Sequence, residues 1–196
     1  MKFRLLGTEF YVSFLFAAVI TAMIAFDRTG YILPLLFAIV MHELGHLTVM
    51  WLLDCAPKRV RLVPASVEIT AKFTASDKNE IAVALCGPAV NIILFLTFGF
   101  NYLAFHSELS LVCCLVNLLI GAFNLLPVIG LDGGTVLFAL LRRRTPQKAC
   151  LIMRIINISL AAVLIVTAVC LWFKGKFNIS LFIIGLYLII TSAVKL

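Results

Sequence analysis

The sequence has few charged residues. Only 13% of its 196 residues are charged, whereas 63% are hydrophobic, and the mean hydropathy is +1.15. Soluble globular domains carry about 25% charged residues. The shortage of charge therefore excludes a soluble globular protein and predicts a polytopic membrane protein, whose spans use up most of the chain. No internal repeat and no low-complexity tract interrupts this pattern.

Cysteine motifs are also lacking. The six cysteines show no CxxC spacing and fall mostly within the apolar segments. This pattern favours small residues of an apolar core over thiol chemistry or a cysteine metal site.

Acidic residues are scarcer than basic ones, 9 against 16, and the net charge is +7. We divide the chain into six spans, at about 10–26, 31–53, 81–104, 109–141, 150–173 and 178–194. On this division all but three of the 16 basic residues fall on one side, the exceptions being Arg28, Lys174 and Lys176. Such a positive-inside bias predicts a multi-pass cell-membrane protein with both termini in the cytoplasm. The basic charge then reflects topology and contact with membrane lipids, and we expect no nucleic-acid partner.

The loop at about 54–80 is the longest polar segment. Within it, "RVRLVPASVEITAKF" alternates apolar and polar residues on both sides of Pro64, which predicts two short strands at the cytoplasmic membrane surface. The alternative is an irregular basic loop held by anionic lipid. The expected fold is thus an all-α polytopic membrane protein with about six transmembrane helices and a short membrane-surface β element.

The fourth apolar segment, 109–141, is too long for one helix. It would reach about 50 Å, against a hydrocarbon core of about 30 Å. We expect a break near "LLPVIGLDGG", which contains Pro127, Gly130, Gly133 and Gly134. Irregular backbone at membrane depth is tolerated only when it is buried in protein or lines a cavity.

The second span carries the motif "HELGH", residues 42–46. A charged group at the bilayer centre costs about 2.5–3.5 kcal/mol on insertion scales, so such residues are usually functional. His42 and His46 are four residues apart and project from one face of a helix. Both imidazoles can then bind one zinc ion, with Glu43 as the general base for water. The alternative is a buried polar cluster that only ties helices together.

Two histidines leave room for a third ligand. Glu43 and Asp132 are the two acidic residues that fall well within the predicted spans. Because Glu43 is the expected base, Asp132 is the candidate third ligand, and its carboxylate suits zinc. Its alternative role is a helix cap at the break. In the predicted topology, "CGPAVN" at 86–91 reaches the same depth as His46 and Asp132. Asn91 and Asn124 could hydrogen-bond a substrate backbone or a developing oxyanion, or only neighbouring helices.

The three motifs "HELGH", "GPAVN" and "NLLPVIGLDGG" resemble those of the site-2 protease family of intramembrane zinc metalloproteases. The resemblance covers about residues 31–141 and implies a three-span catalytic core. It implies that His42, His46 and Asp132 bind one Zn²⁺ per chain and that Glu43 is the catalytic base. Six spans without a PDZ insertion resemble the compact branch that includes the stage IV sporulation protease. Gly130 departs from the proline that many relatives carry there, and we expect no C-terminal CBS domain.

From this resemblance we expect a single integral membrane protease domain over 1–196, with extra spans at about 10–26, 150–173 and 178–194. It would cleave transmembrane protein substrates near the cytoplasmic side, in regulated intramembrane proteolysis, in a bacterial cell membrane. The substrate, the cleavage site and any regulatory membrane partner are not specified by the sequence. Two alternative classes are a catalytically silent zinc-binding scaffold and a metal or ion transporter built on the same His/Asp cluster.

Overall fold

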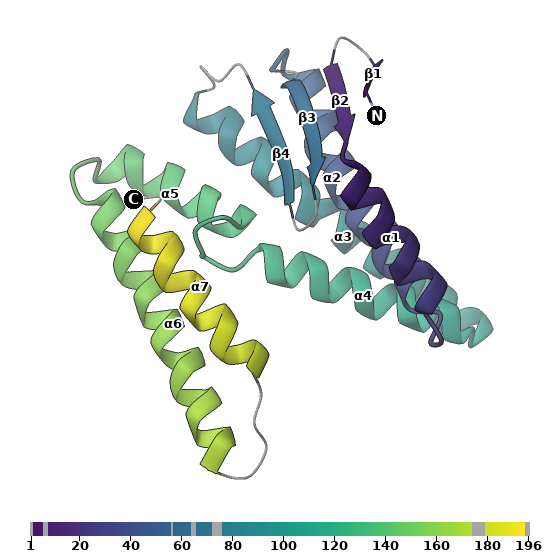
Figure 1. Ribbon diagram of the computed structural model, residues 1–196. Coiled ribbons are helices and arrows are strands. Elements are labelled where there is room, and N and C mark those ends of the chain that lie inside the picture. The colour runs from purple at the N-terminus through teal and green to yellow at the C-terminus, as the bar shows by residue number, and fades with distance from the viewer. Residues whose placement is uncertain are drawn as a thin grey trace. The chain divides into compact units, whose positions relative to one another are not determined.

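A computed structural model describes residues 2–5, 8–55, 57–63, 66–71, 76–173 and 179–194. These residues form seven helices and four strands (Figure 1). The chain divides into two compact units, Met1–Phe123 and Asn124–Leu196. The single domain expected from the sequence stays a prediction.

The first unit contains a four-stranded sheet in the order β1-β2-β3-β4. Its strands are β1 (Lys2–Leu5), β2 (Thr8–Val12), β3 (Pro57–Val63) and β4 (Ser66–Ala71). β2 and β3 pair in parallel, and the other two pairs are antiparallel. β3 and β4 fall within the 54–80 loop where the alternation predicts strands. Their position at a membrane surface stays a prediction, and Pro64 lies outside the described residues.

The N-terminal strands were not expected. The predicted first span begins at about residue 10, but residues 10–12 belong to β2, and α1 runs only over Phe14–Phe26. The apolar pattern alone did not separate the strand from the helix that follows it. Helices still make up most of the described residues, as the all-α class predicts.

A tight turn joins α1 to α2 (Ile32–Leu52). The Asp27 carboxylate accepts hydrogen bonds from the Thr29 hydroxyl at 2.7 Å, and from the backbone N–H groups of Thr29 at 2.8 Å, Gly30 at 3.0 Å and Ile32 at 3.0 Å. These bonds hold the pKa of Asp27 below its usual value, and the bond from the Thr29 hydroxyl has the largest effect. Gly30 has φ +73°, a backbone conformation that glycine adopts without strain.

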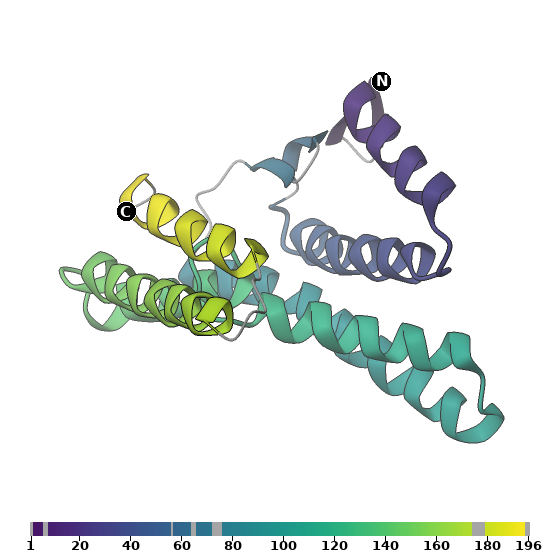
Figure 2. The same ribbon diagram turned by 60° about the horizontal axis from the view of Figure 1, so that its bottom comes forward.

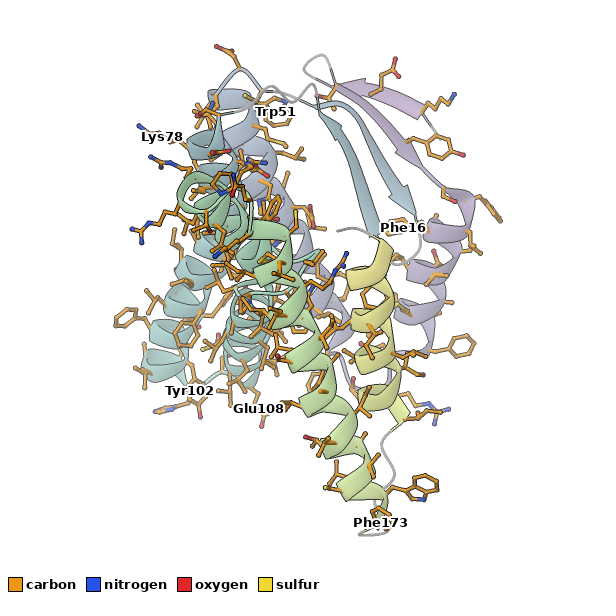
Figure 3. All side chains as sticks on the ribbon, turned by 90° about the vertical axis from the view of Figure 1, so that its left-hand side faces the viewer. Phe16, Trp51, Lys78, Tyr102, Glu108 and Phe173 are labelled. Atoms are coloured by element: carbon orange, nitrogen blue, oxygen red, sulfur yellow. The ribbon has the colours of Figure 1, made fainter. Side chains whose placement is uncertain are left out.

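Helices α2 and α3 (Asp77–Phe105) pack side by side (Figure 2). Figure 3 shows Trp51 and Lys78 at one end of this pair, and Tyr102 and Glu108 at the opposite end. Gly45 permits the close approach, because a Cβ there would stand 2.9 Å from the carbonyl oxygen of Cys86. Helix α4 (Glu108–Asn124) follows α3, and the Ser110 hydroxyl donates to Oδ1 of Asn101 at 2.6 Å.

The second unit contains α5 (Asp132–Arg144), α6 (Ala149–Phe173) and α7 (Ile179–Val194). Helices α6 and α7 lie side by side (Figures 1 and 2). The break predicted within 109–141 is confirmed, since α4 ends at Asn124 and α5 begins at Asp132.

Three of the described helices are long and apolar enough to cross a membrane. They are α2, α3 and α6, with 21, 29 and 25 residues. Helices α1 and α4 are apolar but shorter. The structure thus describes a membrane protein, whereas six spans and the orientation of the termini stay predictions.

Candidate metal centre

His42 and His46 stand one turn apart on α2. Their side chains are buried, with 5% and 8% of their surface exposed. The ring centroids lie 4.8 Å apart at an interplanar angle of 83°, and the two Nε2 atoms are separated by 3.1 Å. The i, i+4 spacing therefore brings the two imidazoles together, as the motif predicts.

The other nitrogen of each ring has its own partner on α3. Nδ1 of His46 lies 2.8 Å from the carbonyl oxygen of Val83, and Nδ1 of His42 lies 2.6 Å from Oδ1 of Asn91. A carbonyl oxygen can only accept, so both Nδ1 atoms are assigned as N–H donors from the hydrogen-bond network. In the neutral rings, both Nε2 atoms then carry lone pairs.

This arrangement fits a zinc ion. Two facing lone pairs repel each other unless a proton or a metal cation lies between them. Two nitrogens bound tetrahedrally to zinc at 2.0–2.1 Å are about 3.3 Å apart, close to the 3.1 Å between the Nε2 atoms. Histidine ligands of metals also commonly donate their second ring nitrogen to a carbonyl or similar acceptor. Both rings have that second contact already.

Asn91 holds His42 from a fully buried position, with 0% of its surface exposed. Its Nδ2 donates to the carbonyl oxygen of Ala38 at 3.2 Å and to Oδ1 of Asn117 at 2.9 Å. Asn117 in turn donates to the carbonyl oxygen of Cys113 at 2.8 Å. Every polar atom of the Asn91 amide is engaged inside the first unit. The geometry favours the structural alternative for Asn91 over contact with a substrate.

Gly87 clears the space beside the imidazoles. A Cβ at this position would collide with Nε2 of His46 and would stand 2.8 Å from Cε1 of His42. Gly121 of α4 leaves room for Asn91 in the same way, because a Cβ at Gly121 would stand 3.2 Å from the Cβ of Asn91. The sequence singled out "CGPAVN" by its expected depth, which stays a prediction, whereas this clearance is visible only in the structure.

Glu43 and Asn124, the other predicted residues of these helices, are both half-buried. Glu43 follows His42 on α2, and Asn124 is the last residue of α4.

Asp132, in the second unit, is half-buried and is the first residue of α5. The N-cap of α5 is Leu131, one residue earlier, so Asp132 does not occupy the position at which aspartate caps helices best. Both the ligand role and the capping role of Asp132 stay predictions. The side chains of His42, His46 and Asp132 make up a group of ligand atoms that could hold a metal ion. Two imidazole nitrogens and one carboxylate oxygen are a usual protein ligand set of catalytic zinc.

The fold and the paired histidines define a helical membrane protein with a candidate metal centre. Residues 102–168 match the model of peptidase family M50. The chain is 36% identical over 125 residues to stage IV sporulation protein FB of Bacillus subtilis, a match that covers 60% of the chain and 43% of the relative. It is 25% identical over 155 residues to a zinc metalloprotease of Methanocaldococcus jannaschii, covering 72% and 45%. The matches thus span less than half of these relatives.

A solved structure, the site-2 protease from Methanocaldococcus jannaschii, has a similar fold. Its TM-score is 0.68 at 23% sequence identity, over 98% of this chain and 93% of that one. The chain thus contains a region that matches peptidase family M50, and it shares its fold with a site-2 protease.

Proposed function

We propose that this protein is a zinc metalloprotease that cleaves transmembrane protein substrates within the membrane. The observation that carries the proposal is the histidine pair, whose Nε2 atoms face each other at 3.1 Å while both Nδ1 atoms are engaged elsewhere. His42, His46 and Asp132 would hold one zinc ion per chain. The match of residues 102–168 to peptidase family M50 supports the same assignment.

Bound zinc supplies a Lewis acid that lowers the pKa of water and polarises a carbonyl group. Glu43 would take a proton from the attacking water and later deliver it to the leaving amine, as a general base and then a general acid. Its place beside His42 puts the base on α2, the helix that also carries the two histidine ligands. Asn124 would hydrogen-bond the substrate backbone.

The substrate segment must be extended before its peptide bonds can be attacked. β1 and β4 are the outer strands of the described sheet, and the free edge of a sheet can pair with an extended peptide. We assign this role to β4, because it is the outer strand of the β3–β4 hairpin, which directly follows α2 in the chain. With both termini in the cytoplasm, the cut would fall near the cytoplasmic side.

Metal content tests the ligand set. Detergent-purified wild-type protein should contain about one zinc per chain, and His46→Ala and Asp132→Ala should each lose it. Zinc lost only in the histidine variant would exclude Asp132 as a ligand. A wild-type protein that takes up no zinc, even when zinc is added back, would overturn the proposal.

Replacement of the base separates catalysis from metal binding. Glu43→Gln should bind zinc like the wild type, but its cleavage rate should fall by about 10²–10⁴-fold, the usual worth of a general base. The assay would use a panel of tagged single-span peptides reconstituted with the protein in liposomes. Wild-type cleavage rates in Glu43→Gln would contradict the mechanism. A zinc-loaded wild type that cleaves none of the peptides would favour the silent scaffold.

A further inference from the structure

The loop that leads to Asp132 is attached to α6 by a buried asparagine. The backbone N–H of Ile129 donates to Oδ1 of Asn157 at 3.2 Å. Asn157 belongs to α6 and has 0% of its surface exposed. Since a backbone N–H can only donate, the amide oxygen is the atom that faces the loop. This bond holds the chain three residues before Asp132.

Apolar packing fixes the same loop. Val128 is buried in a cluster with Ala161 of α6 and Leu188 of α7. Leu131 packs against that cluster as well. The segment between α4 and α5 is therefore seated on the α6–α7 hairpin by contacts on either side of the Ile129–Asn157 bond.

The loop in turn fixes the start of α5. A Cβ at Gly133 would collide with the carbonyl oxygen of Leu125, and one at Gly134 with that of Val128. The N–H of Leu131 donates to the carbonyl oxygen of Val128 at 3.0 Å. The first turn of α5 thus lies directly against the loop, so a shift of the loop displaces Asp132.

The amide nitrogen of the Asn157 side chain indicates that this residue is not present for stability alone. Its Nδ2 atom is buried and has no hydrogen-bond partner among the described residues. A buried donor without a partner lowers stability, and an apolar residue of the same shape avoids that cost. What asparagine offers at this position, and an apolar residue does not, is an acceptor for the hydrogen bond from the N–H of Ile129.

We infer that Asn157 is a positioning residue for Asp132, and that the α6–α7 hairpin is in this way a working part of the metal centre. The inference rests on the proposed role of Asp132 as a zinc ligand. It assigns a function to spans that lie outside the three-span core defined by the sequence motifs.

The test compares Asn157→Leu and Asn157→Ala, which lose the acceptor, with Asn157→Asp, which keeps an oxygen there. Ser159→Ala, at an exposed position of the same helix, is the matched control, and Asp132→Ala is the reference for a lost ligand. Each protein is titrated with zinc. Each is also loaded with Co²⁺ alone, whose visible absorption reports the number and geometry of ligands. Helical circular dichroism of the metal-free proteins reports folding.

Asn157→Leu and Asn157→Ala should fold and bind zinc up to about 10-fold more weakly, because Asn157 acts on Asp132 through the loop and a direct partner of a ligand is worth about 10–100-fold. Their Co²⁺ spectra should shift toward that of Asp132→Ala, while Asn157→Asp and Ser159→Ala stay close to the wild type. If Asp132→Ala changes the spectrum and the two Asn157 variants do not, the inference fails and the proposed function stands. If Asp132→Ala itself keeps the wild-type spectrum, the ligand assignment fails. Loss of helical structure in both the leucine and alanine variants would assign Asn157 to folding and overturn its positioning role.

Discussion

The two compact units hold their candidate ligands by different means. In the first unit, the Asn91 side chain and the Val83 carbonyl group, both on α3, orient His42 and His46 by accepting hydrogen bonds from Nδ1. In the second unit, backbone packing around Gly133 and Gly134 sets the start of α5, where Asp132 stands.

The chemistry of the two ligand types explains the difference. An imidazole has a second nitrogen on the far side of the ring, so a neighbour can orient it without competing for the metal. Aspartate has a single short side chain, and its carboxylate position follows closely from its backbone. A histidine ligand can therefore be tuned by side-chain substitutions nearby, whereas an aspartate ligand depends on the loop that carries it.

The largest expected effect comes from breaking the backbone packing. Gly133→Ala places a Cβ against the carbonyl oxygen of Leu125, and backbone cannot rotate away as a side chain can. We expect the free energy of unfolding to fall by about 3 kcal/mol, together with loss of zinc binding. Thermal melts and zinc titration of the purified variant measure both. The control is Gly99→Ala, whose Cβ would make an ordinary contact at 3.6 Å with Sγ of Cys114. Equal melting of the two variants would contradict the prediction.

Gly87→Ala should act on the metal more than on the fold. Its Cβ would meet the imidazoles of His46 and His42, and these side chains can move at a smaller cost than backbone. We expect zinc affinity to fall by about 100-fold, with less loss of stability than in Gly133→Ala. Gly99→Ala on the same helix is again the matched control. A variant that keeps wild-type zinc affinity would show that the rings do not need this clearance.

A smaller effect is expected from the buried amides. Asn91→Ala removes the acceptor for Nδ1 of His42, and zinc affinity should fall by about 10–100-fold. Asn117→Ala affects His42 only through Asn91, so zinc affinity should fall by less in this variant. Zinc titration of both variants checks this order. Asn101→Ala, on the exposed part of α3, should bind zinc like the wild type. A larger loss in Asn117→Ala than in Asn91→Ala would mean that the amide chain does not work through His42.

Local patterns predicted much of the molecule. The histidine pair follows from i, i+4 spacing on a helix, and the break before Asp132 follows from a segment too long to be one span. The β3–β4 hairpin lies where residues alternate. The strands β1 and β2 were missed, because β2 pairs in parallel with β3 across two intervening helices, and no short window of sequence records that pairing.

By itself, then, the sequence determined the membrane class, the helix that presents His42 and His46, and the place where the chain breaks. Each of these depends on residues a few positions apart, where helix geometry and bilayer thickness suffice. Only the tertiary structure decided that Asn91 holds His42, that Gly87 leaves room for both rings, and that Asn157 holds the loop before Asp132. These contacts join residues 28 or 49 positions apart in the cases of Asn157 and Asn91, and they exist only once the helices have packed.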